Sequence, residues 1–362
     1  MSSSELFEGL NPDQLDAVVH PAGPLLVVAG AGSGKTRVLT HRIAHLIEQG
    51  GVSPFEILAI TFTNKAADEM KQRVGALVGP VAEKMWVSTF HSACVRILRR
   101  DAQVLGYPSS FTIYDQADAV RLTGYVLRDF NLDSKRFPPR SVHASISAAK
   151  NELIDTRHYR ERAQTPAERT IADVYDEYQA RLRKAGAMDF DDLRGVTVEL
   201  FQKNPDVLDH YQRRFRHILV DEYQDTNPVQ NELVLLLAGE HHNVCVVGDQ
   251  DQSIYRFRGA DLRNIVEFET RFPDTTVVLL EQNYRSTQTI LDAANAVIAR
   301  NLGRKPKELW TDAGGGEKII RYHADDEGDE ARWIAHEMAR LHDSEHHRWR
   351  DLAVFYRTNA QS

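Results

Sequence analysis

The stretch Ala29-Gly30-Ala31-Gly32-Ser33-Gly34-Lys35-Thr36 decides the fold of the N-terminal part of this chain. It follows a short apolar run, Leu25–Ala29, and precedes a segment with the spacing of an amphipathic helix. It fits the pattern G-x-x-x-x-G-K-[ST], except that Ala29 stands where the first glycine belongs. Glycines let backbone N–H groups close around phosphate oxygens, and a helix N-terminus adds partial positive charge. The stretch therefore predicts a phosphate-binding loop between a strand and a helix.

A second segment supplies the acidic groups that such a loop needs. Lys35 is expected to reach the β- and γ-phosphates of a nucleotide, and Thr36 to ligate Mg²⁺. Far downstream, the apolar run Ile218–Val220 ends in two neighbouring acids. Asp221 and Glu222 are candidate residues for the metal's coordination shell, and Glu222 also suits a base that takes a proton from the attacking water. Adjacent acids alone more often indicate a solvated turn, but together with Lys35 they predict a Mg-ATP site.

Short apolar runs alternate with amphipathic helices at both ends of the chain, which is typical of a parallel α/β sheet. The predicted strands are Leu25–Ala29, Ile57–Phe62, Met85–Thr89, His217–Val220, Val244–Val247 and Val277–Leu280. Gln252 and Arg285 follow the last two strands, at the edge where open α/β sheets bind ligands. Both residues are candidates to sense or stabilise the γ-phosphate.

The region between Cys94 and Tyr211 has few strand signals and is predicted to be a helical insertion into the sheet. Its clearest helix starts at Thr165–Glu168, a capping box with proline at the first helical position, and ends at Gly186. The insertion accounts for the long separation of Lys35 from Asp221.

After Asn283 a second α/β stretch is expected. It comprises a helix at Thr287–Asn301, a loop at Gly314–Gly316, strands at Ile319–Tyr322 and Leu352–Tyr356, and a helix between these strands. The acidic run Asp325–Glu330 is expected to precede that helix, where negative charge suits the N-terminus.

Composition restricts the class of protein. A chain of 362 residues with 42% hydrophobic and 27% charged residues predicts two or three globular domains. No stretch approaches the roughly 20 apolar residues of a membrane span, and Met1–Leu10 lacks the apolar core of a signal peptide. The two cysteines, Cys94 and Cys245, lie in apolar runs, so we expect no disulfide framework and a cytoplasmic location. The net charge of −8 means that any polyanion must bind in a local groove.

Motifs along nearly the whole chain resemble those of superfamily 1A DNA helicases of the UvrD/PcrA/Rep group, in the family's order. They are Leu10–Gln14, Ala29–Thr36, Thr61–Ala67 (TFTNKAA), Ser88–Ser92 (STFHS), Met188–Leu193 (MDFDDL), Asp221–Thr226 (DEYQDT), Val246–Ala260 (VVGDQDQSIYRFRGA), Glu281–Ser286 (EQNYRS) and Phe355–Ser362 (FYRTNAQS). Alanine is normal in this family at the position of Ala29.

The resemblance implies a RecA-like P-loop NTPase sheet with a helical insertion domain, followed by the beginning of a second RecA-like domain. The implied division is a motor domain 1A at 1–92 and 212–283, a helical domain 1B at 93–211, and an incomplete motor domain 2A at 284–362.

The resemblance also implies roles for residues in the ATP site, with ATP and Mg²⁺ as cofactors. Gln14 would bind the adenine edge, and Tyr284 and Arg37 would stack on the adenine ring, as an aromatic ring and a guanidinium can do. The roles that the chemistry gives to Lys35, Thr36, Asp221, Glu222, Gln252 and Arg285 agree with those of the family.

The DNA-facing residues implied by the resemblance are Phe62, Asn64, His91, Tyr255, Phe257, Arg258, Arg357 and Asn359. Aromatic faces stack on any base, at roughly 1–3 kcal/mol per base, which suits a motor that must pass over every sequence. An aromatic residue taken alone is more often part of a core. Gln252 stands close in sequence to Tyr255 and Phe257. A movement of Gln252 on ATP hydrolysis is therefore predicted to reach the aromatic residues that stack on DNA bases.

The implied activity is that of an ATP-dependent 3′–5′ helicase and single-stranded DNA translocase in DNA repair or replication. It would act on single-stranded and 3′-tailed duplex DNA as a monomer, with DNA-repair proteins as partners. Later family motifs, including an arginine finger, would follow Ser362, so we expect weak ATP binding, poor hydrolysis and no unwinding by this chain alone. The alternatives are the motor part of a RecB/AddA-like helicase–nuclease and a non-stepping ATP-dependent DNA-binding module. The short insertion argues against the first, and an intact Lys35 and Glu222 against the second.

Overall fold

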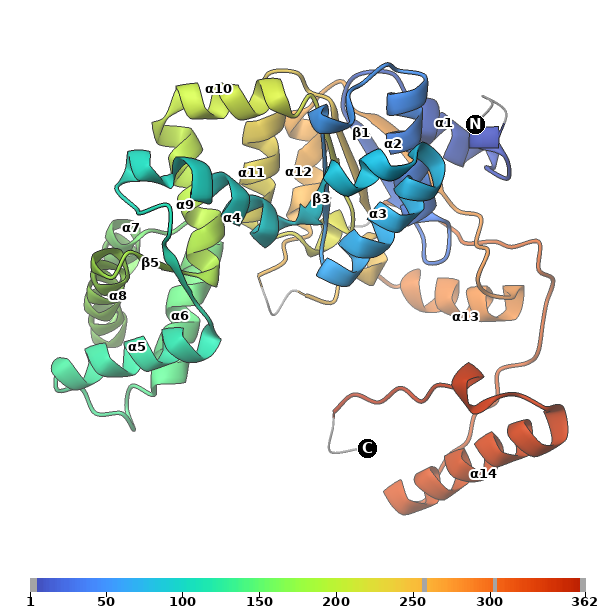
Figure 1. Cartoon of the computed structure of the whole chain (residues 1–362). Coiled ribbons are helices and arrows are strands. Elements are labelled where there is room, and N and C mark those ends of the chain that lie inside the picture. The colour runs from blue at the N-terminus through green and yellow to red at the C-terminus, as the bar shows by residue number, and fades with distance from the viewer. Residues whose placement is uncertain (1–4, 256–258, 302–304, 359–362) are drawn as a thin grey trace.

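The computed structural model describes residues 5–255, 259–301 and 305–358. Its centre is a six-stranded sheet in the order β3-β2-β6-β7-β1-β8, with every pair of neighbours parallel (Figure 1). The strands are β1 Leu25–Ala29, β2 Ile57–Thr61, β3 Trp86–Thr89, β6 His217–Val220, β7 Val244–Gly248 and β8 Thr276–Leu280. All the strands predicted for this sheet are confirmed, with ends that differ by one residue at most.

The sheet is covered on both faces, which explains why its strands are continuous apolar runs. Leu25, Val27 and Ala29 pack with helices α1 Pro12–Val19, α2 Lys35–Glu48 and α3 Asn64–Val78. Leu26 and Val28 point the other way, because side chains alternate along a strand. They belong to the core that includes residues of α4 Phe90–Asp101, α9 Phe190–Lys203, α10 Pro205–Arg214, α11 Pro228–Ala238 and α12 Arg263–Arg271.

The predicted helical insertion is confirmed and has a core of its own beside the sheet (Figure 1). Its helices are α5 Gln116–Asp129, α6 Pro139–Asn151, α7 Thr156–Arg162 and α8 Pro166–Lys184, and α9 joins it to the sheet. Thr165 and Glu168 form the predicted capping box, and Gly186 has the positive φ of 58° expected after a helix. A small parallel pair, β4 Thr112–Tyr114 with β5 Ala187–Asp189, was not predicted because strands of three residues leave too short a pattern.

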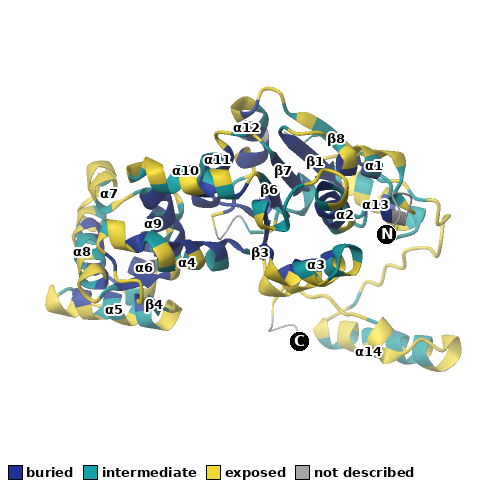
Figure 2. Cartoon of the chain, turned by 45° about the horizontal axis from the view of Figure 1, so that its top comes forward, coloured by how far each residue is buried: buried dark blue, intermediate teal, exposed yellow. Residues whose placement is uncertain are grey.

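The second α/β stretch forms helices but no sheet. Helix α13 Gln288–Ile298 and helix α14 Glu327–Glu345 confirm the helical predictions, and Asp326 caps α14 within the acidic run. The strands predicted at Ile319–Tyr322 and Leu352–Tyr356 are wrong, since the described residues there form no strand and Phe355 is 94% exposed. The segments on either side of α14 are coloured mostly as exposed (Figure 2). A strand is stable only beside a partner that takes up its backbone hydrogen bonds, and none of the described strands lies alongside these segments.

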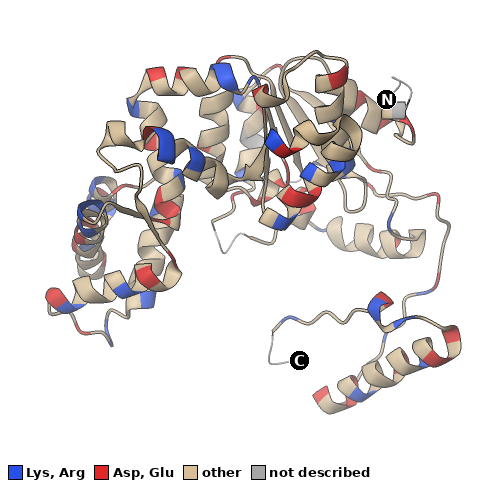
Figure 3. Ribbon diagram, in the orientation of Figure 1, with Lys and Arg blue, Asp and Glu red and all other residues tan. Residues whose placement is uncertain are grey.

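Short 3₁₀ helices complete the secondary structure, at Glu5–Phe7, Pro54–Glu56, Pro80–Lys84, Ala102–Leu105, Tyr223–Asp225, Gln250–Gln252 and Trp349–Asp351. Within the described ranges no helix combines the length and apolar character needed to cross a bilayer. Acidic and basic residues occur together on the sheet domain and on the insertion (Figure 3).

Candidate nucleotide and DNA sites

The predicted phosphate-binding loop lies at the C-terminal end of β1. The end of β6 lies at the same edge of the sheet, and only β7 separates the two strands. Gly32 and Gly34 have φ values of 67° and 88°, a left-handed conformation that side chains rarely adopt. Lys35 begins α2, and its ammonium lies 3.3 Å from Glu222 Oε2. The Lys35 side chain is 11% exposed, and no hydrogen bond within the described residues satisfies its Nζ. The loop thus presents a buried positive charge held by an acid from the other half of the predicted site.

Asp221 and Glu222 differ sharply in environment although they are neighbours. Burial raises the pKa of Asp221 to about 7, with the Glu222 carboxylate as the second cause and Lys35 opposing both. Glu222 has φ 50° and ψ 45°, a left-handed backbone that is uncommon for a residue with a side chain and is frequent at functional sites. A buried carboxylate beside a like charge is stabilised by a cation, and oxygen ligands suit Mg²⁺. The Asp221 carboxylate therefore fits a Mg²⁺ ion and Lys35 fits a phosphate, and Thr36 follows Lys35 at the start of α2.

Arg285 is brought to the same loop by the segment that follows β8. Asn283 Nδ2 donates to Ala31 O at 2.6 Å, and Tyr284 N donates to Gly32 O at 2.9 Å. A Cβ atom on Gly32 would lie 2.8 Å from Arg285 Cβ, so the two backbones are in close contact. Gln252, after β7, donates its side-chain amide to the carboxylate of Asp249. The ends of β1, β6, β7 and β8 thus supply the four predicted catalytic residues.

The residues predicted to hold the base are grouped near the start of α1. Gln14 is 1% exposed, its Nε2 donates to Ser33 O at 2.9 Å, and its Oε1 accepts from Asn11 N at 3.1 Å. Asn11 Nδ2 also donates to the Tyr284 hydroxyl at 2.9 Å, and Arg37 donates to Glu8 O. Tyr284 is 54% exposed and free to stack, whereas Gln14 would have to exchange existing hydrogen bonds to bind adenine.

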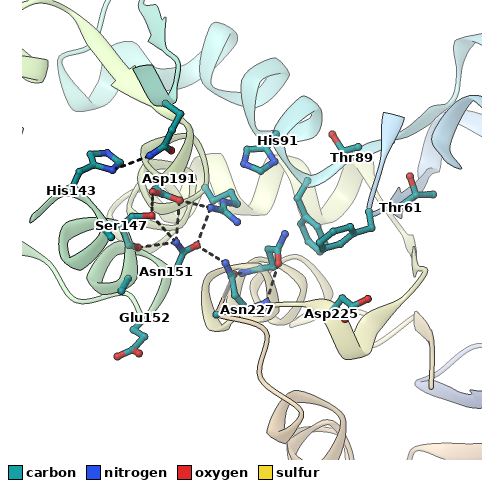
Figure 4. Close-up of a pocket in the computed structure, with 18 residues that line it drawn as sticks. Thr61, Thr89, His91, His143, Ser147, Asn151, Glu152, Asp191, Asp225 and Asn227 are labelled. Carbon is teal, nitrogen blue, oxygen red and sulfur yellow. Dashed lines mark hydrogen bonds and ion pairs between the residues drawn. The ribbon is translucent and has the colours of Figure 1, made fainter. Parts of the chain in front are cut away.

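A cavity of about 530 Å³ lies between the sheet domain and the insertion, and Phe62 and His91 line it (Figure 4). An adjoining open groove is lined by Phe62, Asn64, His91, Arg96 and Phe190, among others. Tyr255 stacks on Phe62 with ring centroids 4.8 Å apart. The structure therefore brings together four of the residues predicted to bind DNA. Arg357 is exposed on the C-terminal segment and lines neither cavity, and Phe257, Arg258 and Asn359 lie outside the described residues.

His91 is a neutral ring at physiological pH. Burial lowers its pKa to about 4, the Arg194 guanidinium adds to the effect, and Asp191 opposes it. The ring meets Phe190 edge-on at 5.8 Å, and Phe190 is 46% exposed. The sequence analysis did not predict a role for Phe190, because a single aromatic residue between the acids of the Met188–Leu193 motif carries no pattern of its own.

The acids of that motif, for which the sequence suggested no chemistry, divide between two networks. Asp189 and Asp192 both accept from Lys150 Nζ at 2.7 Å inside the insertion. Asp191 accepts from Arg194 at 2.6 Å and from Asn151 at 3.1 Å.

Asn151 extends the second network to the sheet domain. Its Oδ1 accepts from Asn227 Nδ2 at 2.6 Å, and Asn227 caps α11 directly after the Asp221–Thr226 motif (Figure 4). One polar chain therefore links the insertion to the segment that carries the predicted catalytic acids.

Comparison with known proteins agrees with this geometry. The model of the UvrD/REP helicase N-terminal domain matches residues 10–273, and that of the UvrD-like helicase C-terminal domain matches residues 278–362. The chain is 56% identical over 371 residues to the ATP-dependent DNA helicase UvrD1 of Mycobacterium tuberculosis, and 52% identical over 360 residues to the ATP-dependent DNA helicase PcrA of Bacillus subtilis. These alignments cover 99% of this chain and 48% and 49% of the relatives, so the chain spans about half their length. By the extent of these matches, the chain belongs to the UvrD/REP helicase family.

Proposed function

We propose that this chain binds and hydrolyses Mg-ATP at the carboxyl edge of its sheet, as part of a 3′–5′ helicase that moves along single-stranded DNA. The observation that carries the proposal is the 3.3 Å contact between Lys35 and Glu222, with the buried Asp221 beside it. The relatives named above are called ATP-dependent DNA helicases, which supports the same activity.

In this proposal the ends of four neighbouring strands supply the different chemical roles of the site. Lys35 exchanges its contact with Glu222 for the β- and γ-phosphates, which releases the Glu222 carboxylate to take a proton from the attacking water. Thr36 and Asp221 would hold Mg²⁺, which neutralises phosphate charge when bound. Arg285 and Gln252 stabilise the charge that develops on the γ-phosphate. Tyr284 and Arg37 stack on the base, while Gln14 binds its edge.

The DNA path proposed here runs over the open groove between the two domains. The stacked pair of Phe62 and Tyr255 comes from the sheet domain, and Phe190 from the insertion lines the groove in edge-on contact with His91. Rings at these positions would stack on successive bases without selecting among them. The DNA-binding residues must be grouped in a local groove, because the net charge of −8 gives no general attraction for a polyanion.

The wider predictions remain part of the proposal. They are the division into 1A (1–92 and 212–283), 1B (93–211) and an incomplete 2A (284–362), a monomeric state in the cytoplasm, action on 3′-tailed duplexes, and repair proteins as partners. We expect slow ATP turnover by these 362 residues alone.

The test is ATP binding and single-turnover hydrolysis by the chain, with and without single-stranded DNA. Lys35→Ala should abolish binding of a fluorescent ATP analogue and reduce hydrolysis to background, whereas Lys203→Ala, on the exposed side of α9, should change neither. Hydrolysis by Lys35→Ala at the wild-type rate would refute the proposed site. Binding to DNA with a 3′ or a 5′ tail then tests the substrate.

A further inference from the structure

Lys307 lies on a segment that follows α13 and returns to the carboxyl edge of the sheet, where the proposed ATP site lies. Lys305 N donates to Gln250 Oε1 at 2.8 Å, and Trp310 pairs with the residues after β8. Leu309 lies against the phosphate-binding loop so closely that a Cβ atom on Gly30 would stand 2.1 Å from Leu309 Cδ2. The segment therefore packs directly beside the proposed catalytic groups.

The ammonium of Lys307 is buried between two acids of the segment after β7. It donates to Asp249 Oδ1 at 2.6 Å and to Asp251, and the side chains of Lys307, Asp249 and Asp251 are 4%, 2% and 10% exposed. Buried charges persist only when they are paired, and removal of one member leaves an uncompensated charge. Burial at this level distinguishes the group from an ordinary surface ion pair.

Asp249 connects Lys307 to the proposed catalytic residues on both sides. Its other carboxylate oxygen accepts from the Gln252 amide, and its backbone N–H donates to Gln224 Oε1 at 2.9 Å. Gln224 Nε2 in turn donates to Glu222 Oε2 at 2.8 Å. The hydrogen-bonded chain thus runs from Lys307 through Asp249 to both Gln252 and Glu222.

We propose that Lys307 is a positioning residue that sets the orientation of Gln252 through Asp249, and that the segment after α13 thereby controls ATP turnover. The Gln252 amide donates either to Asp249 or to the γ-phosphate. Lys307 neutralises Asp249 and holds its carboxylate in one place, so that Gln252 can leave it without exposing a buried, unpaired charge. The inference rests on the proposed ATPase function and adds regulation by residues outside the nucleotide-binding motifs.

The test is a double-mutant cycle between Lys307→Met and Gln252→Ala, with single-turnover hydrolysis and nucleotide affinity as readouts. We expect Lys307→Met to slow hydrolysis about 10- to 100-fold, the effect of a misplaced catalytic group, with affinity changed less than about threefold. In the Gln252→Ala background the same substitution should have no further effect. Lys307→Arg should restore most of the rate.

The matched control is Lys305→Met, which removes the ion pair of Lys305 with Glu269 in the same segment and should leave hydrolysis unchanged. Lys307→Gln, of similar length, replaces Lys307→Met in the cycle if the latter does not fold. Additive effects of Lys307 and Gln252, or a wild-type rate in Lys307→Met, would overturn the inference. If Lys35→Ala also hydrolyses ATP at the wild-type rate, the proposed function fails instead.

Discussion

The ammonium of Lys35 lies 3.3 Å from the carboxylate of Glu222, although the whole helical insertion separates the two residues in sequence. The contact exists because β1 and β6 are both inner strands of a parallel sheet and end at the same edge. In the absence of a phosphate the two charges compensate each other. Because ATP would have to break this ion pair, the roles of Lys35 and Glu222 can be tested separately.

Glu222→Gln should abolish hydrolysis while nucleotide binding persists. The amide cannot take a proton from water, so single-turnover hydrolysis should fall by about 10²–10⁴-fold. Lys35 loses its charged partner at the same time, so affinity for an ATP analogue should be equal to or greater than that of the wild type. Glu69→Gln, an exposed acid on α3, is the control for removal of a carboxylate. Loss of nucleotide binding in Glu222→Gln would contradict a role as base.

Lys150→Met should destabilise the helical insertion. The substitution leaves Asp189 and Asp192 as buried, unpaired carboxylates, which costs about 3–5 kcal/mol in the free energy of unfolding. Denaturant unfolding monitored on the insertion measures the loss. Lys203→Met removes an exposed ion pair on α9 and should cost no more than about 0.5 kcal/mol.

The pH dependence of that loss gives a second check on Lys150. Burial and the neighbouring Asp189 raise the pKa of Asp192 to about 6 even with the ammonium present. Without the Lys150 ammonium, the folded state binds protons more readily than the unfolded state, so a lower pH reduces the loss in the free energy of unfolding. The deficit of Lys150→Met should be larger at pH 8 than at pH 5.5. An equal deficit at both values would exclude the buried-charge explanation.

The sheet and the grouping of the proposed ATP-site residues at its edge could be predicted from sequence because their signals are local. An apolar run followed by glycines and Lys35, or by Asp221 and Glu222, specifies a strand, a turn and the chemistry at its end. Parallel strands then bring those ends together. The predicted strand at Ile319–Tyr322 failed for the opposite reason, since an apolar run becomes a strand only when another strand pairs with it.

Lys307 and Phe190 show a second limit of sequence analysis. Lys307 stands in a polar segment with no pattern around it, and only the folded chain shows that its ammonium is buried between Asp249 and Asp251. Phe190 follows the buried strand β5 yet is 46% exposed, whereas an aromatic residue taken alone is more often part of a core. Both residues contact partners that are distant in sequence, so only the tertiary structure reveals their surroundings.

Phe190→Ala should weaken binding of single-stranded DNA by about 1–3 kcal/mol, the contribution of one stacked base. The slope of affinity against salt concentration should not change, because an aromatic ring releases no counterions. Fluorescence anisotropy with a labelled oligothymidylate measures both quantities. Phe55→Ala is a matched control, since Phe55 is also 46% exposed but lies in Pro54–Glu56, outside the groove residues. A changed salt slope would indicate an altered charge distribution and not a lost stacking contact.

His217→Gln should reduce the acid sensitivity of the fold. Burial lowers the pKa of His217 to about 4, and Arg42, His241 and Arg216 add to the effect, whereas an unfolded histidine titrates near 6.5. Between these values the unfolded state binds a proton that the folded state does not, so stability falls as the pH drops from about 6.5 to about 4. The slope of the free energy of unfolding against pH should be smaller in the variant by the equivalent of up to about one proton, or about 1.4 kcal/mol per pH unit. Denaturant unfolding at pH 5 and 6 measures the slope, and the wild-type and variant curves should run parallel between pH 7 and 8. A wild-type slope in the variant would show that His217 takes up its proton without unfolding the sheet.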